Sequence, residues 1–357
     1  MSTLIKNLHI QNFKSVRDLS LNCDRINIFI GKPNAGKSNI LEAVSLLGAD
    51  YSKGKFMEGQ VRYSRIEDIF SDFSYQNSIE VLCDDIAATF SFNDDEFTVE
   101  IRPNIASKNN GSDISKSPFS FFSSMVDSTG HIKNTYQRNK DEQAVTDGCS
   151  QLFQQFAKGL SPVKKYIFKF SELNNLNSNQ QYLLPPHGEN FYFIVRSHKA
   201  LQEEIQAFLK PNGLKLFLDE ATKRVSVVRE TEFSFLNFPL QLIPDTFQRY
   251  MFHAAAIMSN RNSVLLFEEP EAHSYGPYIY QLAQHILNDE GGNQYFITTH
   301  NPYFLLPLMQ EGKDVAIFTT WFEDYQTHAK RLSEDEIRDI LDYGMDVFLN
   351  LDHFIPA

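Results

Sequence analysis

Eight residues, Gly31-Lys32-Pro33-Asn34-Ala35-Gly36-Lys37-Ser38, match the pattern G-x-x-x-x-G-K-[ST] without a departure. At average residue frequencies, a chance match in a chain of 357 residues has a probability of about 1%. The motif follows a short β-branched run, residues 26–30, and opens a segment whose apolar residues recur at helical spacing. This order places backbone N–H groups and the positive end of a helix dipole at the loop, where phosphates bind. The alternative is a tight glycine turn between strand and helix, but the context favours a nucleotide site.

The side chains of this loop have separate expected tasks. The Lys37 ammonium group would contact the β- and γ-phosphates, and the Ser38 hydroxyl would coordinate Mg²⁺. The sequence therefore predicts ATP and Mg²⁺ as cofactors. The predicted nucleotide-binding residues are Gly31, Lys32, Pro33, Asn34, Ala35, Gly36, Lys37, Ser38 and Asn39.

A second polar element ends an apolar strand-like run, Val264-Leu265-Leu266-Phe267, with two adjacent carboxylates, Glu268 and Glu269. In a phosphate-loop protein, a carboxylate at this place contributes to the metal site and a neighbouring one acts on the attacking water. We assign Glu268 to the Mg²⁺ side and Glu269 to the activation of water. The usual metal-side residue is Asp, and Glu is one methylene longer. A solvated acidic loop is the alternative, which the phosphate loop makes less favourable.

The third element is Thr298-Thr299-His300-Asn301, which follows another apolar run. Ligands of open α/β sheets bind at the carboxyl ends of the strands. We therefore expect the imidazole of His300 to contact the γ-phosphate and to respond to its loss. Taken alone, such a histidine is more often a structural residue; together with the two other motifs it indicates a catalytic one.

Composition limits the classes of function. The chain carries 45 acidic and 33 basic residues, a net charge of −12, which disfavours non-specific binding of nucleic acid but leaves a local basic groove open. No run approaches 18 apolar residues, so we expect no transmembrane helix and no membrane partner, and the first 24 residues do not resemble a signal peptide. Three widely spaced cysteines form neither a disulfide framework nor a metal cluster, which predicts a reducing, cytoplasmic location.

Changes in pattern divide the chain into three parts. Residues 1–102 contain the phosphate loop, followed by three short apolar runs typical of an antiparallel meander. We interpret residues 103–212 as an inserted, partly helical lobe. Its first part, to about residue 161, is rich in Ser, Asn, Lys and Asp and is expected to lie outside the central sheet. Residues 213–357 alternate strands with helices, a rhythm typical of a parallel sheet covered on both faces. The predicted class is α/β.

In this order, the phosphate loop, Leu-Leu-Phe-Glu-Glu-Pro-Glu-Ala-His and Thr-Thr-His-Asn-Pro resemble the ABC-type ATPase heads of the SMC, RecF and OLD group. Residues 8–16 resemble the strand of those heads on the nucleobase side. The likeness is strongest to OLD-like ATPases of bacterial defence and toxin–antitoxin loci. It implies a P-loop ABC-type head with a mostly parallel core sheet, an antiparallel β subdomain and a mainly helical insertion. Only 232 positions separate Lys37 from Glu269, too few for the coiled-coil arm of a true SMC protein.

Two departures from that family matter. Its heads carry a Ser-Gly signature that contacts the γ-phosphate held by the partner subunit. The corresponding segment here lacks the pair, which leaves Asp245, Gln248 and Arg249 as signature-like contacts in trans, with a solvated helix position as the alternative for Arg249. OLD nucleases also continue into a Toprim nuclease domain, for which the 57 residues after His300 are too few. We therefore expect slow hydrolysis, and any nuclease on a separate chain.

The leading hypothesis is an ABC-type ATPase whose ATP-bound heads form a homodimer or higher oligomer. It would control a separate effector protein, a nuclease or toxin, in anti-phage defence. A nucleotide-gated sensor with little hydrolysis is one alternative, and a RecF-like repair ATPase that binds DNA is another, although the net charge of −12 disfavours it. Arg62 and Arg65 either couple the nucleotide to the inserted lobe or are ordinary surface residues.

Overall fold

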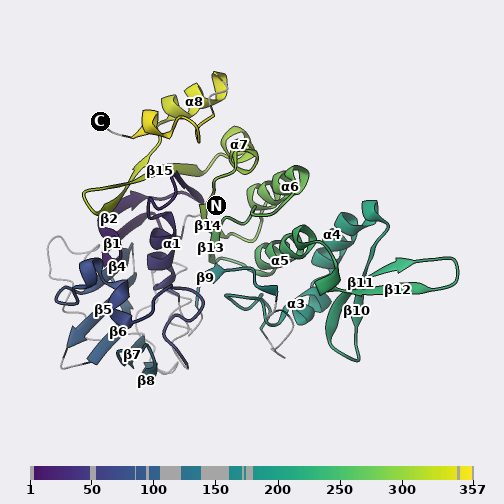
Figure 1. Cartoon of the computed structure of the whole chain (residues 1–357), viewed down its shortest axis with the longest axis horizontal. Helices are drawn as coiled ribbons and strands as arrows, with labels where there is room; N and C mark the ends of the chain where they lie inside the picture. The colour runs from purple at the N-terminus through teal and green to yellow at the C-terminus, as the bar shows by residue number, and fades with distance from the viewer. Residues whose placement is uncertain are drawn as a thin grey trace, which may run out of the picture.

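The computed structural model describes residues 4–48, 54–84, 86–93, 96–104, 122–137, 161–170, 173, 180–343 and 346–355. The parts of the predicted inserted lobe at 105–121 and 138–160 lie outside these residues. In the described part of the chain, three sheets and the helices around them form an elongated molecule (Figure 1).

A six-stranded sheet holds the predicted nucleotide motifs. Its strand order is β16-β15-β3-β14-β13-β9, and every neighbouring pair is parallel except β15 and β16. The strands are β3 (Ile26–Gly31), β9 (Val163–Tyr166), β13 (Val264–Glu268), β14 (Gln294–Thr298), β15 (Val315–Glu323) and β16 (Gln326–Arg331). The run at 26–30, the run at 264–267 and the apolar run before the Thr298 motif are strands β3, β13 and β14, and the sheet is mostly parallel as expected.

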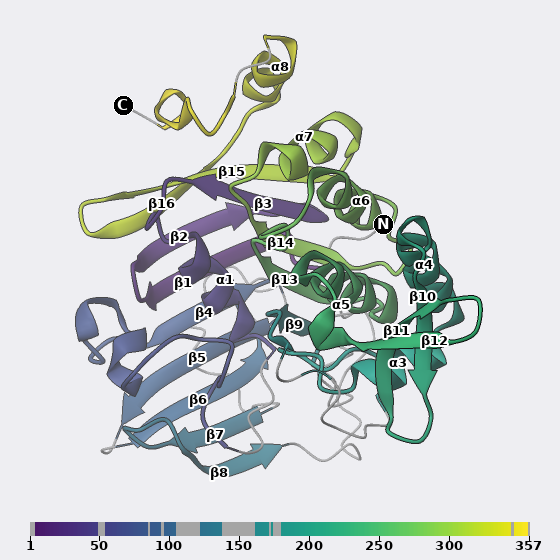
Figure 2. The same cartoon turned by 45° about the vertical axis from the view of Figure 1, so that its right-hand side comes forward.

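Both faces of this sheet are buried, because alternate residues of each strand enter different cores. Ile28 of β3 and Leu265 of β13 pack with α5 (Asp245–Ser259), α6 (Gly276–Leu287) and α7 (Pro302–Glu311). Phe29 and Leu266 pack on the other side with α1 (Lys37–Ser45). Such two-sided burial explains why these strands are continuous apolar runs. Figure 2 shows α5, α6 and α7 side by side along the sheet.

A second, seven-stranded sheet is antiparallel throughout, in the order β2-β1-β4-β5-β6-β7-β8. The three predicted runs of the meander are its strands β4, β5 and β6. Val16, Ile79 and Phe90 of this sheet share a core with Ile40 of α1, so the helix lies between the two sheets. The strands are β1 (Asn7–Phe13), β2 (Val16–Asn22), β4 (Ile79–Cys83), β5 (Ile86–Asn93), β6 (Glu96–Pro103), β7 (Phe122–Val126) and β8 (Ile132–Gln137).

The range 103–212 contributes to several parts of the fold. Its strands β7 and β8 extend the antiparallel sheet, and β9 pairs with β13 at the edge of the parallel sheet. Helical structure follows in α3 (Phe191–Ser197) and α4 (Lys199–Leu209). Beside these helices lies a three-stranded antiparallel sheet of β10 (Lys215–Asp219), β11 (Arg224–Glu230) and β12 (Phe235–Pro239). The domain boundaries themselves stay a prediction.

The chain closes with α8 (Glu334–Asp342), which begins at a capping box formed by Ser333 and Glu336. Glu336 also accepts a hydrogen bond from Lys330. Within the described ranges, no helix combines the length and the apolar character needed to cross a bilayer.

Candidate nucleotide site

The phosphate loop connects the buried strand β3 to α1, as the sequence predicts. Gly36 is the N-cap of α1 and has φ of 89°, the left-handed region that favours glycine. A Cβ atom on Gly36 would lie 1.8 Å from Oγ1 of Thr327, and one on Gly31 would lie 2.2 Å from the carbonyl oxygen of Thr320. Because the β15–β16 hairpin approaches the loop so closely, neither position has room for a Cβ atom.

A cavity of 580 Å³ lies over this loop. Glu269 and His300, the predicted catalytic residues at two other strand ends, face into it together with Arg62 and Ser15. The fold thus unites three motifs that lie far apart in the sequence. The loop residues that line the cavity are Pro33, Asn34, Ala35, Gly36, Lys37, Ser38 and Asn39.

Two of the predicted loop residues lie outside this lining. Gly31 sits beneath the loop, where its carbonyl oxygen accepts a hydrogen bond from Lys37. The Lys32 ammonium group is exposed and pairs with Asp352 at 2.6 Å. Gly31 and Lys32 therefore contact other residues of the chain and do not line the cavity.

Lys37 is buried and its ammonium group is folded over the loop. It donates hydrogen bonds to the carbonyl oxygens of Gly31, at 3.0 Å, and Lys32, at 2.9 Å. Burial lowers the pKa of Lys37 to about 8, and the carboxylate of Glu269 opposes that shift. A lysine with this pKa carries its positive charge at neutral pH, as phosphate binding requires.

Glu269 and His300 lie next to each other at the carboxyl end of the sheet. The Nε2 atom of His300 is 3.6 Å from Oε1 of Glu269. The backbone N–H of Glu269 donates to the carbonyl oxygen of Thr298 on the neighbouring strand at 3.0 Å. Partial burial, followed by the nearby charge of Lys37, lowers the pKa of His300, while Glu269 raises it. The net effect is a lowered pKa of His300, which favours the neutral imidazole beside the carboxylate of Glu269.

Glu268 does not line the cavity. Its Oε1 atom lies 2.8 Å from the ammonium group of Lys165, a residue of β9 that is only 1% exposed. Lys165 also donates to the carbonyl oxygen of Gln60. A metal ion held by Ser38 and Glu268 would therefore share this carboxylate with a buried lysine, which no local sequence pattern marks.

The donor chemistry at this edge fits Mg²⁺. The Ser38 hydroxyl and the carboxylates at the end of β13 are oxygen ligands, and Mg²⁺ in nucleotide sites is held by few protein groups plus phosphates. The described residues contain no group of three or more His, Cys, Asp or Glu side chains that could hold a metal ion.

Glu271 supports the loop that carries His300. It is 5% exposed and accepts hydrogen bonds from the Thr299 hydroxyl at 2.5 Å and from the backbone N–H of His300 at 3.3 Å. Burial raises the pKa of Glu271 to about 7. In the sequence, only the position of Glu271, two residues after Glu269, indicates that it could belong to the site.

Arg62 was predicted either to couple the nucleotide to the lobe or to be a surface residue. Its Nε donates to Oε1 of Glu42 at 2.6 Å, and Lys14 forms an ion pair with the other oxygen of this fully buried carboxylate. Arg62 also lines the cavity. Arg65, by contrast, is exposed and lies 3.9 Å from Asp68.

The signature-like residues lie at the start of α5 and none of them lines the cavity. Arg249 pairs with Asp245 at 2.6 Å, and its guanidinium group lies over the ring of Phe168. Gln248 is buried and donates to the carbonyl oxygen of Ile243. Within one chain, these three residues contact their own surroundings and not the nucleotide cavity.

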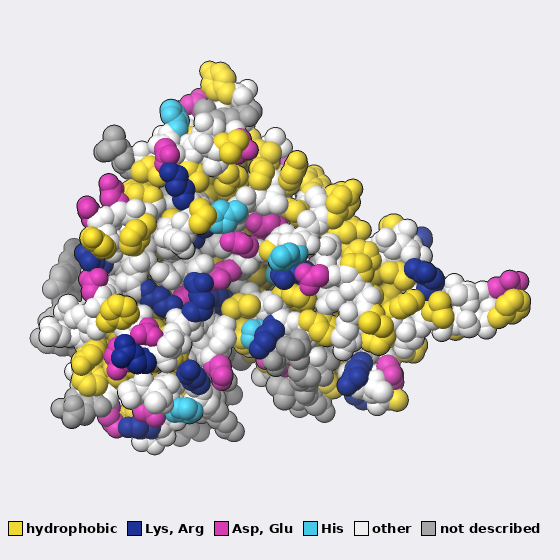
Figure 3. Space-filling model, viewed as in Figure 1, with side chains coloured by type: hydrophobic (Ala, Val, Ile, Leu, Met, Phe, Trp, Pro, Cys, Tyr) yellow, Lys and Arg dark blue, Asp and Glu magenta, His cyan; other side chains and the backbone are white. Residues whose placement is uncertain are grey.

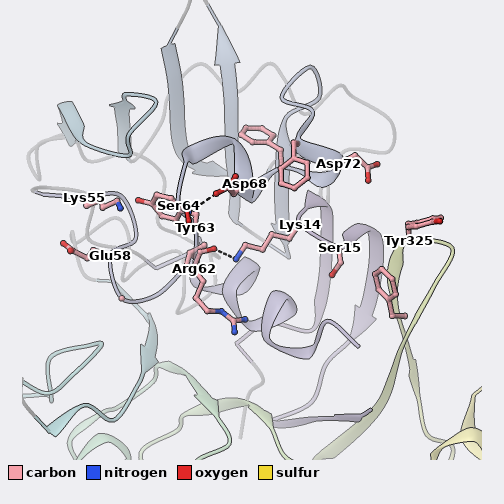
Figure 4. Close-up of a pocket in the computed structure, with 15 residues that line it drawn as sticks. Lys14, Ser15, Lys55, Glu58, Arg62, Tyr63, Ser64, Asp68, Asp72 and Tyr325 are labelled. Atoms are coloured by element: carbon pink, nitrogen blue, oxygen red, sulfur yellow. Dashed lines mark hydrogen bonds between the residues drawn. The ribbon is translucent and has the colours of Figure 1, made fainter. Parts of the chain in front are cut away.

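A second cavity, of 940 Å³, adjoins the first and shares Ser15 and Arg62 with it. Figure 4 shows Lys14, Ser15, Arg62 and Tyr325 around this space. Phe73 and Phe322 line it and are substantially exposed, so aromatic faces are available there. In the space-filling view, Lys and Arg side chains gather near the middle of the molecule beside acidic ones (Figure 3).

Comparisons with known proteins identify a family for this chain. A family model described as an AAA ATPase domain matches residues 4–224, which include the phosphate loop, Ser15 and Arg62. An uncharacterised protein of Methanocaldococcus jannaschii is 28% identical over 202 residues, 46% of this chain and 92% of that protein.

Two solved structures show a similar fold. One is an SMC head bound to the C-terminal winged-helix domain of ScpA, with a TM-score of 0.55 and 15% identity, covering 94% of this chain and 99% of the other. The second, an SMC head with an extended coiled coil bound to the C-terminal domain of ScpA, derives from Pyrococcus furiosus. It has a TM-score of 0.55 and 12% identity, and covers 95% of this chain and 98% of the other. The chain belongs to the AAA ATPase domain family and has the fold of an ABC-type SMC head.

Proposed function

We propose that this protein is an Mg²⁺-dependent ATPase whose nucleotide state controls its association with a second head and with a separate effector. The observation that carries the proposal is the single cavity lined by the phosphate loop, Glu269 and His300. A fold shared with many proteins does not fix a function, but these side chains have defined roles in phosphoryl chemistry.

In this mechanism each group of the chain has its own role. The Lys37 ammonium group and the loop N–H groups stabilise phosphate charge, and the Ser38 hydroxyl and Glu268 would hold Mg²⁺. Bound Mg²⁺ would neutralise developing charge on the β- and γ-phosphate oxygens. Glu269 orients the attacking water and accepts its proton. His300, whose Nε2 atom lies 3.6 Å from that carboxylate, would contact the γ-phosphate.

The nucleoside would extend from the phosphate loop toward the second cavity. Ser15 and Arg62 line both spaces, so the two cavities meet at these residues. The exposed rings of Phe73 and Tyr325 offer flat apolar faces, which suit the base.

Hydrolysis is proposed to be slow. Lys165 engages one oxygen of Glu268, and the segment before α5 lacks the Ser-Gly pair that the resembled family uses in trans. These two observations favour the second candidate function, a nucleotide-gated sensor with little turnover. An effector that is a nuclease or toxin and a role in anti-phage defence belong to the same proposal and rest on the resemblance to OLD-like ATPases. The proposed cytoplasmic location rests on the three widely spaced cysteines. The net charge of −12 disfavours the RecF-like alternative.

The test is light scattering after gel filtration, with and without Mg-ATP, combined with phosphate release from the same samples. The variants are Lys37→Ala and Glu269→Gln. Lys199→Ala and Glu203→Gln make the same chemical changes at exposed positions of α4 and serve as matched controls. We expect ATP to enlarge the wild type and both controls, Lys37→Ala to stay small, and Glu269→Gln to stay assembled. Removal of a charge-stabilising group should lower the rate about 10²–10³-fold.

Each result separates the two candidates. Assembly of the wild type with phosphate release supports the hydrolysing switch. Assembly without phosphate release supports the sensor. If nucleotide changes neither the size of the wild type nor the phosphate concentration, the proposed function is wrong.

A further inference from the structure

The segment 346–355, which follows α8, packs beside the nucleotide motifs, and we call it the strap. Figure 1 shows it as the yellow turn next to the C-terminus. It includes the 3-10 turn η7 (Leu351–Phe354). Val347, Leu351 and Phe354 are buried in the core that also contains residues of β3 and β13. These three side chains recur at helical spacing, so they anchor one side of the strap in the protein.

An ion pair joins the strap to the phosphate loop. Both carboxylate oxygens of Asp352 accept hydrogen bonds from the Lys32 ammonium group, at 2.6 and 2.8 Å. The backbone carbonyl oxygen of Lys32 in turn accepts a hydrogen bond from Lys37. The pair is exposed, and exposed ion pairs add little to stability. Its main effect is therefore geometric, because it ties the strap to the loop.

An aromatic contact joins the strap to His300. The centroids of the Phe348 and His300 rings are 6.4 Å apart and the ring planes meet at 41°, within the usual range for aromatic pairs. His300 lines the nucleotide cavity, whereas Phe348 does not. The imidazole therefore has the carboxylate of Glu269 as its neighbour in the cavity and the ring of Phe348 as its neighbour outside it.

One short segment thus contacts two separate motifs. Lys32 belongs to the loop after β3, and His300 follows β14, the strand that pairs with β3 in the parallel sheet. Phe348 and Asp352 are four positions apart, a spacing that places both on one side of a helical turn. The strap therefore reaches from the phosphate loop to the histidine with two side chains that the core does not bury.

We propose that the strap positions the His300 imidazole for the γ-phosphate, with Phe348 as the contacting residue and Asp352 as the tether to the phosphate loop. This inference rests on the proposed function, which assigns the γ-phosphate contact to His300. Without the Phe348 ring, the imidazole would spend time in its other staggered rotamers, and the affinity would fall by the fraction of time lost. The strap thus favours ATP over ADP, because ADP has no γ-phosphate.

Equilibrium binding of Mg-ADP and of a non-hydrolysable Mg-ATP analogue with a β–γ imido bridge tests the proposal. The ratio of the two affinities reports the γ-phosphate contact and requires no turnover. Phe348→Ala should lower the affinity for the ATP analogue about three- to tenfold and leave that for ADP unchanged. Phe348→Tyr keeps a ring and should restore the ratio. Phe233→Ala makes the same change at a 90% exposed phenylalanine between β11 and β12 and should keep the wild-type ratio.

Two results for Phe348→Ala would overturn the proposal. One is a ratio equal to that of the wild type. The other is an equal loss of affinity for both nucleotides, which is what a purely structural role of Phe348 predicts.

His300→Ala separates this inference from the proposed function. It should lower the ratio by itself, and adding Phe348→Ala should lower the ratio no further, because Phe348 acts through the imidazole. If His300→Ala keeps the wild-type ratio, the γ-phosphate role of His300 in the proposed function is wrong and the inference falls with it. If His300→Ala lowers the ratio and Phe348→Ala does not, the inference alone is wrong. A further loss in the double variant also overturns it.

Asp352→Asn tests the tether. It should lower the ratio in the same direction as Phe348→Ala but by only about twofold, since an exposed ion pair is weak. Asp335→Asn makes the same change at an exposed ion pair of α8 and serves as the matched control. A wild-type ratio in Asp352→Asn would overturn the role of Asp352 as a tether.

Discussion

The ammonium group of Lys165 on β9 lies 2.8 Å from a carboxylate oxygen of Glu268 at the end of β13. Lys165 is 1% exposed and Glu268 is 25% exposed, so the lysine depends on this carboxylate for compensation of its charge. The ammonium group of Lys165 also donates a hydrogen bond to the carbonyl oxygen of Gln60. This ion pair holds the carboxylate of Glu268, which the sequence predicts as a ligand of Mg²⁺, next to Lys165.

Removing the carboxylate alone should leave a buried ammonium group without its counter-charge. We expect Glu268→Gln to lower the free energy of unfolding by about 1–3 kcal/mol. The double variant Lys165→Met, Glu268→Gln should recover part of this loss, because no buried charge remains. Urea denaturation measures both, and equal midpoints for the wild type and Glu268→Gln would contradict the prediction.

The pKa of Lys37 predicts how nucleotide affinity depends on pH. Burial lowers this pKa to about 8 in the free protein, and the protonated form binds phosphate. Affinity for Mg-ATP should therefore fall as pH rises from about 7.5 to about 9.5, a range in which phosphate groups are already fully ionised. Lys37→Arg keeps its charge throughout and should bind with little dependence on pH. A fluorescent ATP analogue measures the affinity, and a flat profile for the wild type would refute the assignment.

Glu271 predicts a dependence of stability on pH. Its pKa is raised by burial to about 7 from an ordinary 4.5, so the folded protein binds more protons than the unfolded chain between these values. The wild type should therefore lose stability as pH rises through this window. Glu271→Gln has no proton to lose there and should gain up to about 3 kcal/mol over the wild type above pH 7, with little difference near pH 4.5.

Thermal unfolding at several pH values measures this difference. Glu203→Gln removes an exposed carboxylate of α4 and should run parallel to the wild type. If Glu271→Gln also runs parallel to the wild type, Glu271 is ionised in the folded protein throughout this range.

Gly36 predicts a steric coupling between the phosphate loop and β16. Gly36→Ala should destabilise the protein by at least about 1–2 kcal/mol, since it combines a left-handed backbone with a Cβ atom 1.8 Å from Thr327. Thr327→Ala should cost less, although it removes a 2.6 Å hydrogen bond with Ser15. In the double variant the clash with Oγ1 should be relieved, while the backbone cost and a 2.8 Å approach to Cβ of residue 327 persist. Chemical denaturation of the four proteins forms a double-mutant cycle, and strict additivity would show that the side chains do not meet.

The sequence alone predicted the elements that hold the site. The period-two and continuous apolar patterns identified β3, β13 and β14, and the phosphate loop identified the start of α1. These features are local, because the apolar pattern of a strand and the geometry of the loop are set by residues within a few positions of one another. Glu269 and His300 followed from the same rule, since polar residues after parallel strands collect at one edge of the sheet.

Other groups were decided only by tertiary structure. Lys165, Glu271 and Thr327 acquire their roles from partners 103, 28 and 291 positions away in Glu268, Thr299 and Gly36. A lysine in a strand gives no local sign that a carboxylate of the neighbouring strand will neutralise it. Local patterns determine which elements form and where polar residues end them. Burial, and with it each pKa and each ion pair, depends on which distant element packs against them.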